Sequence, residues 1–170
     1  MTGPRKRPGD LRAERRHRPH GCWGHLIVAP LWVAYQANLG TLLRTCDAVG
    51  ACLGVPHGPH YRQALKQGNT LPGPSCIHWA HSPAGWLRRQ RDHGFRIVGV
   101  ELAEGAVRLA DVAPARGPTV IVLGHEHHGI PDEAWDLLDE VVEIPMVGRG
   151  ASLNVAVAGS LVLYKLAGLS

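Results

Sequence analysis

The chain has 170 residues, of which 45% are hydrophobic, and its formal net charge is +4; this length and composition suit one domain with a buried core. No apolar run reaches the roughly 18 residues of a membrane span, and no apolar segment follows the basic N-terminus, which argues against a secretory signal. We therefore expect a cytoplasmic protein with reduced cysteines.

The positive charge is concentrated at the start of the chain. Residues 1–20 contain seven Lys/Arg and two Asp/Glu, a net of +5, whereas the rest contains 11 Lys/Arg and 12 Asp/Glu, a net of −1. Basic arms of this kind often bind nucleic-acid phosphates, and the alternative is a solvated leader. We expect residues 1–22 to form an arm, as a tail or a short helix, and residues 23–170 to form one domain.

Strands and helices alternate along the rest of the chain. We predict strands at 25–29, 52–55, 96–102, 119–124 and 141–145, and helices at 38–51, 82–94, 131–140 and 152–168. Residues 56–75 hold Pro, Gly, His and Asn without periodicity, which predicts a long loop. The strand cores "IVGV" and "VIVL" lack polar alternation, which indicates an α/β fold with a parallel sheet covered on both faces.

Ligands of parallel sheets bind beyond the carboxyl ends of the strands. Three polar or glycine-rich loops follow predicted strands there, at 30–40, 124–130 and 145–152. In the first loop Arg44 lies six residues beyond Asn38, either facing solvent or serving a site. In the second loop, Glu126 is either a helix-cap acid or a site residue.

The third loop is the most informative. Pro145 ends the strand, and Gly148 and Gly150 permit a ligand to approach the backbone. Ser152 is expected to cap the last helix. A cap does not account for Asn154, which interrupts an apolar face and needs polar partners.

Metal binding is not predicted. The four cysteines, Cys22, Cys46, Cys52 and Cys76, include no CxxC pair. Cys76, His78 and His81 offer three zinc ligands without an evident fourth, and zinc sites of the structural kind need four.

Taken together, the loops resemble the three motifs of the TrmH/SpoU branch of the SPOUT RNA methyltransferases. The matching segments are "NLGTLLR" (38–44), "GHEHHG" (124–129) and "IPMVGRGASLN" (144–154), and the resemblance covers about residues 25–167. Ile130 stands where the family usually has leucine, and Gly159 where alanine is commoner. The neighbouring histidines 125, 127 and 128 are also unusual.

The resemblance implies a C-terminal trefoil knot, a homodimer, and transfer of a methyl group from S-adenosylmethionine to a ribose 2′-hydroxyl of RNA. The implied catalytic residues are Asn38, Arg44, Glu126, Ser152 and Asn154. The implied cofactor-binding residues are Glu101, Leu102, Gly124, Ile144, Met146, Gly148, Ser152 and Leu153. No metal is required for this reaction.

The resemblance favours tRNA as the substrate. The alternatives are the same reaction on rRNA, for example in antibiotic resistance, and an RNA-binding homologue without catalysis. Retention of Arg44, Glu126, Ser152 and Asn154 argues against the inactive homologue. A generic nucleotide-binding domain is not supported, because neither G-x-G-x-x-G nor G-x-x-x-x-G-K-[ST] occurs.

Overall fold

The computed structural model describes residues 5–16, 18, 21–22 and 25–170. Within them, one seven-stranded sheet has the order β3-β2-β1-β6-β4-β7-β5, and every pairing is parallel. The strands are β1 (Leu26–Ala29), β2 (Cys52–Pro56), β3 (Ile77–Ala80), β4 (Arg96–Val100), β5 (Val107–Arg108), β6 (Thr119–Leu123) and β7 (Glu140–Glu143). The predicted parallel α/β fold is confirmed.

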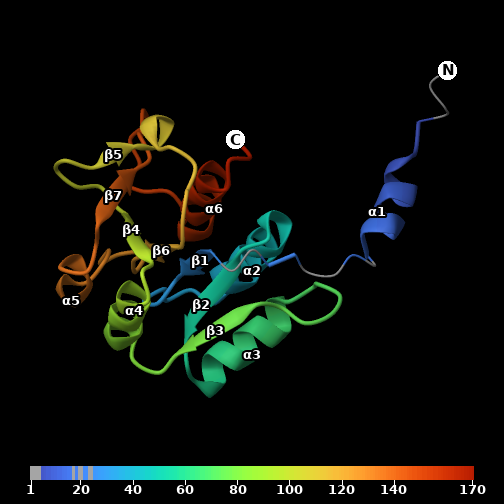
Figure 1. The fold of residues 1–170 in the computed structure, drawn as a ribbon, viewed down its shortest axis with the longest axis horizontal. Helices are drawn as coiled ribbons and strands as arrows, with labels where there is room; N and C mark the ends of the chain where they lie inside the picture. Colours follow the sequence, from blue (N-terminus) through green and yellow to red (C-terminus); the bar gives the residue numbers. More distant parts are fainter. Residues whose placement is uncertain (1–4, 17, 19–20, 23–24) are drawn as a thin grey trace.

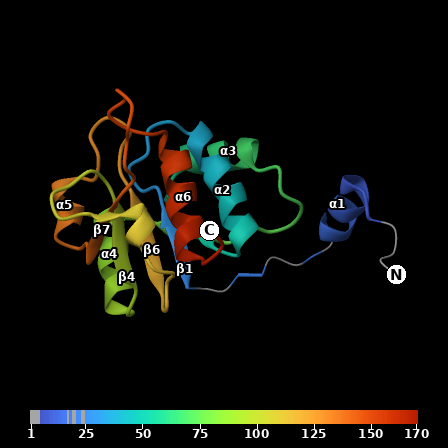
Figure 2. The same cartoon turned by 90° about the horizontal axis from the view of Figure 1, so that it is seen from above.

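Helices cover both faces of this sheet (Figures 1 and 2). One face packs against α2 (Ala37–Val49), α3 (Pro59–Gly68) and α6 (Val155–Leu166), and the other against α4 (Pro83–Asp92) and α5 (Asp132–Trp135). A short 3-10 turn, η1 (Leu109–Asp111), follows β5. Successive residues of the strands alternate between two apolar clusters, one on each face, which explains why the strand sequences lack polar alternation.

The basic arm contains helix α1 (Pro8–Arg16), which buries none of its residues. In both views α1 lies apart from the sheet and its helices (Figures 1 and 2). A short helix was one of the two predicted forms of the arm. Its two last-turn arginines, Arg15 and Arg16, are exposed, so their charges are available to a partner.

The predicted loop at 56–75 is wrong, because this segment contains α3. The helix starts at Pro59 and has only two buried residues, Ala64 and Leu65, so its apolar periodicity is too weak to detect. It packs closely on α2: a Cβ on Gly40 would lie 2.9 Å from the Cα of Gly68. The glycine in the first motif therefore permits helix–helix contact.

Two further predictions differ from the structure. The helix predicted at 131–140 is only the four residues of α5, because the Asp139 carboxylate accepts a hydrogen bond from the backbone N–H of Ile97 and the chain enters β7 at Glu140. The edge strands β3 and β5 were not predicted; they are four and two residues long. Short edge strands carry little periodic signal.

Two of the cysteines are not reduced thiols in this structure. Leu53 pairs with Ile77 in the register of β2 and β3, so the residue before each, Cys52 and Cys76, lies opposite the other. They form a disulfide with a Cα–Cα distance of 4.9 Å. The prediction of reduced thiols is therefore wrong for this pair, whereas Cys22 and Cys46 are free.

The last helix fits tightly against the sheet. A Cβ on Gly159 would lie 2.7 Å from a methyl carbon of Leu123 and 3.0 Å from one of Leu42, so close packing accounts for glycine there. The end of α6 is also bound to the segment before β6, since Ala115 donates its N–H to the carbonyl of Leu166 at 2.8 Å. Within the described residues, no helix is long and apolar enough to cross a membrane.

Candidate functional site

A cavity of about 820 Å³ lies at the carboxyl ends of β4, β6 and β7. This is the edge at which parallel sheets bind ligands. Every residue predicted to bind the cofactor lines it, namely Glu101, Leu102, Gly124, Ile144, Met146, Gly148, Ser152 and Leu153. These residues come from three loops that are far apart in the sequence, and the order of the strands brings the loops together.

Glycines shape one wall of the cavity. A Cβ on Gly124 would lie 2.3 Å from the carbonyl carbon of Gly129, so no larger residue fits there without moving the loop. Gly129 has φ +69, and a Cβ on it would lie 2.5 Å from a carboxylate oxygen of Glu101. His125 closes the turn through two backbone hydrogen bonds with Gly129, each of 2.9 Å. These contacts therefore fix the conformation of the turn 125–129, which contains Glu126.

The Glu126 carboxylate is the centre of a polar network beside the cavity. It accepts hydrogen bonds from the backbone N–H groups of Ala34 (2.8 Å) and Tyr35 (3.0 Å), and from the side-chain amide of Asn38 (3.0 Å). Asn154 donates its amide to Asn38 Oδ1 at 3.0 Å. Three of the predicted catalytic residues, Asn38, Glu126 and Asn154, thus form one chain of hydrogen bonds that joins the three motif loops.

This network keeps Glu126 charged. Partial burial acts to raise the pKa of the carboxyl, but the hydrogen bonds from Ala34, Tyr35 and Asn38 outweigh it, so the pKa of Glu126 lies below its usual value. No basic side chain contributes to this shift. Glu126 therefore acts as an anionic acceptor for the backbone of the first loop, and the alternative of a helix-cap acid is not supported.

Asn154, not Ser152, caps the last helix. The side-chain oxygen of Asn154 accepts hydrogen bonds from the N–H groups of Ala156 and Val157, and α6 begins at Val155. The predicted Ser152 cap is wrong because the loop extends two residues further than the apolar pattern indicated. Ser152 lies instead in the wall of the cavity. The amide of Asn154 therefore has two roles, since its nitrogen binds Asn38.

Arg44 is separate from this network. It is exposed on α2 and donates a hydrogen bond to the hydroxyl of Thr70 at 2.9 Å. It does not line the cavity. The structure therefore joins three of the five predicted catalytic residues in one network, places Ser152 in the cavity wall and leaves Arg44 on the neighbouring helix surface.

Sequence reasoning did not single out Tyr35. Its N–H binds Glu126, and its exposed phenol is 3.1 Å from Nε2 of His127, so Tyr35 connects the first loop to the histidines of the second. His125 and His127 both line the cavity. The only signal for Tyr35 was its position in a polar loop after β1.

A parallel sheet with a cavity of this size over its strand ends defines a cofactor-binding α/β protein. The chain belongs to the SpoU rRNA Methylase family, whose model matches residues 25–164. That match spans the whole sheet and all residues of the candidate site. The TrmH/SpoU assignment drawn from the three motifs is confirmed.

Similar proteins agree with this family. The chain is 33% identical over 143 residues to a tRNA (guanosine(18)-2'-O)-methyltransferase of Aquifex aeolicus, covering 82% of this chain and 67% of that protein. The crystal structure of an A. aeolicus TrmH/SpoU tRNA modifying enzyme is similar with a TM-score of 0.74 and 29% identity, covering 94% of this chain and 83% of that one. An AdoMet-bound rRNA methyltransferase from Sinorhizobium meliloti gives a TM-score of 0.70 at 29% identity, covering 87% and 57% of the two chains.

Proposed function

We propose that this protein transfers a methyl group from S-adenosylmethionine to a ribose 2′-hydroxyl of RNA, and that its substrate is tRNA. The observation that carries the proposal is the cavity, because all eight residues predicted to bind the cofactor line it. The similarity to a tRNA 2'-O-methyltransferase over most of both chains supports tRNA.

The residues of the cavity fit S-adenosylmethionine. Leu102, Ile144, Met146 and Leu153 offer apolar surface for a purine ring, and the glycine wall at 124 leaves backbone groups accessible. The bound cofactor supplies an activated methyl group on a sulfonium. We also propose that residues 144–166 are threaded as the family's trefoil knot, which is supported by the contact of the α6 end with the segment before β6.

The polar network has a positioning role in this proposal. Glu126 holds the backbone of residues 34–35, and Asn38 and Asn154 connect that loop to the start of α6. All three motif loops are therefore fixed around the cavity before RNA binds. Such preorganisation lowers the activation barrier for methyl transfer, because the acceptor oxygen and the methyl donor must be arranged in line. Ser152 lines the cavity, and in this proposal its hydroxyl donates a hydrogen bond to the bound substrate or cofactor.

Arg44 is the residue that meets the RNA. A guanidinium stays protonated at all relevant pH values, so it acts by binding the adjacent phosphate and stabilising negative charge on the 2′-oxygen. Among the described residues, the guanidinium donates a hydrogen bond to the neutral hydroxyl of Thr70, which RNA can replace without breaking an ion pair.

The position of Arg44 favours a homodimer. The arginine does not line the cavity of its own chain, and α6 beside it exposes an apolar stripe of Val157, Leu161 and Tyr164 at relative exposures of 48%, 42% and 37%. These positions are spaced i, i+4 and i+7, so they share one helix face. In this proposal a second copy covers this stripe on α6 and brings its Arg44 toward the cavity.

An rRNA substrate is the second candidate, and the similarity to an rRNA methyltransferase supports it. The two are separated by tritium transfer from labelled S-adenosylmethionine to bulk tRNA and, separately, to rRNA, followed by mapping of the modified nucleoside. We expect a 2′-O-methylated nucleoside in tRNA. Label in rRNA alone would reject the tRNA assignment, and label in neither, with the folded protein, would reject the enzyme.

A further inference from the structure

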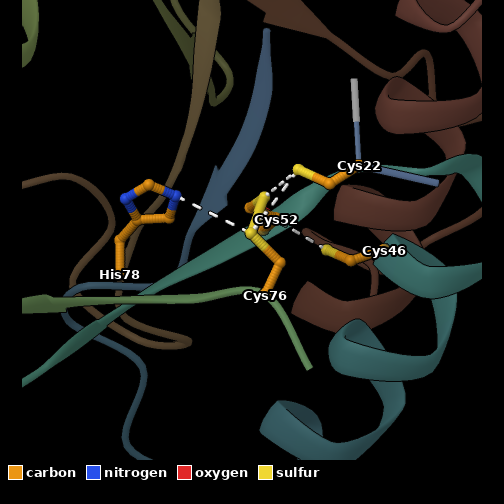
Figure 3. Close-up of a disulfide and its surroundings, with 5 residues drawn as sticks. All are labelled: Cys22, Cys46, Cys52, Cys76 and His78. Carbon is orange, nitrogen blue, oxygen red and sulfur yellow. Dashed lines mark hydrogen bonds between the residues drawn. A yellow bond between two sulfur atoms is a disulfide. The ribbon is translucent and has the colours of Figure 1, made fainter. Parts of the chain in front are cut away.

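A cluster of sulfur atoms lies at the opposite end of the sheet from the cavity. Cys22 precedes β1, Cys52 begins β2, and Cys76 immediately precedes β3. The Sγ atom of Cys22 is 2.9 Å from that of Cys52 and 3.6 Å from that of Cys76, while Cys52 and Cys76 are joined (Figure 3). Three cysteines separated by 29 and 23 residues thus meet at the amino ends of three neighbouring segments.

A histidine lies beside this cluster of three cysteines. Nε2 of His78 is 3.9 Å from Sγ of Cys76, and Figure 3 shows that nitrogen directed at the sulfurs. His78 is half-buried, and its ring lies edge-on to the buried Trp86. An imidazole nitrogen is among the commonest zinc ligands in proteins.

We propose that, when Cys52 and Cys76 are reduced, Cys22, Cys52, Cys76 and His78 bind one zinc ion. Three thiolates and one imidazole are a usual ligand set for structural zinc, with Zn–S distances of about 2.3 Å and Zn–N of about 2.0 Å. Tetrahedral bonds of that length separate two sulfurs by about 3.8 Å. The 3.6 Å between Cys22 and Cys76 is close to this value. Cys22 and Cys52 are 2.9 Å apart and must separate after reduction, and His78, 3.9 Å from Cys76, must move closer to the other two sulfurs.

The sequence analysis considered a different set of three possible zinc ligands. His81 was considered with Cys76 and His78, but its ring stacks on His57 at a centroid distance of 4.2 Å. The missing ligands come instead from Cys22 and Cys52, which only the strand order brings near Cys76. All ligand positions are then filled by protein, so the ion has a structural role and no open position for a substrate.

The disulfide and the zinc site would use the same sulfur atoms of Cys52 and Cys76, so the protein can form one or the other but not both. Binding the ion to the reduced protein releases three thiol protons, because each cysteine must become a thiolate. The disulfide leaves Cys52 and Cys76 without thiolates and thus excludes the ion. In a reducing compartment the thiol form is favoured, and the ion would fix Cys22, six residues after the end of α1, to the edge of the sheet.

Metal content gives the first test. The full-length protein is purified with a phosphine reductant and without chelators, and its zinc is measured by mass spectrometry. We expect one tightly bound zinc ion per chain. Anaerobic titration of metal-stripped, reduced protein with Co²⁺ should give the ligand-field bands of tetrahedral cobalt together with thiolate charge-transfer absorption. Absence of both zinc and cobalt binding in the reduced protein would overturn the proposal.

Matched variants test the ligand set. Cys22→Ser and His78→Gln should weaken zinc affinity by more than about 100-fold, because the loss of a residue that only hydrogen-bonds to a ligand already costs up to about that much. Cys46→Ser and His81→Gln remove a cysteine and a histidine outside the ligand set and should retain affinity, with folding checked by circular dichroism. Because Cys46 is buried, the His81→Gln comparison stands even if Cys46→Ser is unstable. Unchanged affinity in both ligand variants would show that zinc binds elsewhere.

Discussion

Arg44 differs from the other candidate site residues in its surroundings. Asn38, Glu126 and Asn154 are joined by hydrogen bonds, whereas Arg44 is exposed and donates a hydrogen bond to Thr70. Arg44→Ala should therefore leave the affinity for S-adenosylmethionine unchanged and lower kcat by about 100-fold or more, as expected for a lost transition-state contact. Calorimetry measures the affinity and tritium transfer measures the rate.

Thr70→Ala is the matched control for Arg44. It removes the resting partner of the guanidinium but not the charge, so kcat should stay within about threefold of the original, since a surface hydrogen bond contributes only about 1 kcal/mol. If both variants lost activity equally, the contact between Arg44 and Thr70 would be structural. Loss of cofactor binding in Arg44→Ala would likewise contradict the assignment.

The lowered pKa of Glu126 predicts a pH dependence of stability. Because the folded-state pKa lies below the unfolded value of ~4.3, the ionised carboxylate stabilises the fold fully above pH ~4.3, and this contribution is lost as the pH falls through the folded pKa. Glu126→Gln should destabilise the protein by a constant amount from neutral pH down to the unfolded-state pKa of the carboxyl. The difference from the original protein should then shrink in urea unfolding at lower pH.

A difference between the two proteins that grew on acidification would contradict this sign. Asp92→Asn provides a comparison, because this carboxyl is exposed at the end of α4. Its substitution should leave the pH profile of stability unchanged.

The site residues were predictable because they sit at strand ends, and their exact roles were not. Parallel strands place their carboxyl ends at one edge, so loops that follow them must converge. The choice of helix cap depends on where the backbone turns, and both Ser152 and Asn154 are good capping residues. The hydrogen bonds of Glu126 to the backbone of Ala34 and Tyr35 leave no side-chain signature in the sequence at all.

Elements were predicted well where burial is heavy on one or both faces. The central strands β1, β4 and β6 and the helix α2 carry strong apolar patterns. Helix α3 was missed because only two of its residues are fully buried. The length of α5 was overestimated because local propensity favoured a helix where tertiary contacts of Asp139 start a strand. Propensity is overridden by tertiary context in such segments.

The exposed stripe on α6 predicts the effect of a charge there. Leu161→Glu places a carboxylate where the proposed second copy packs, at a cost of at least about 3 kcal/mol, or roughly 100-fold in the dimer dissociation constant. Light scattering should show a dimer at micromolar concentration for the original protein and a monomer for the variant. If Arg44 of a second copy completes the site, the monomeric variant should also lose methyl transfer.

Gln90→Glu is the control for this element. It makes the same change of one negative charge on α4, which covers the other face of the sheet. This variant should remain dimeric and active. A monomer at micromolar concentration before any substitution would reject the dimer.

At the scale of the whole molecule, the charge is divided between two parts. The arm holds seven of the 18 Lys/Arg, and the remaining chain is nearly neutral. The predicted division after residue 22 stays a prediction; the family match begins at residue 25. Cys22 contacts Cys52 on the sheet, so the end of the arm is adjacent to the body. A partner of the arm would thus be held near one edge of the sheet.

Deletion of residues 1–20 therefore tests whether the arm anchors RNA, with Cys22 retained. Each arm cation that contacts a phosphate should contribute roughly one unit to the slope of log K against log salt. The truncated protein should bind RNA more weakly and with a flatter slope, and its cofactor affinity should not change. Replacement of Arg12, Arg15 and Arg16 by glutamine keeps the chain length and should reproduce much of the effect.

The rival anchor is the body, where Arg62 stacks over Trp79 at 4.9 Å and Arg149 is exposed. Equal slopes and affinities for all three proteins would assign the RNA to that surface, because a charge that never meets a phosphate releases no counterion when RNA binds.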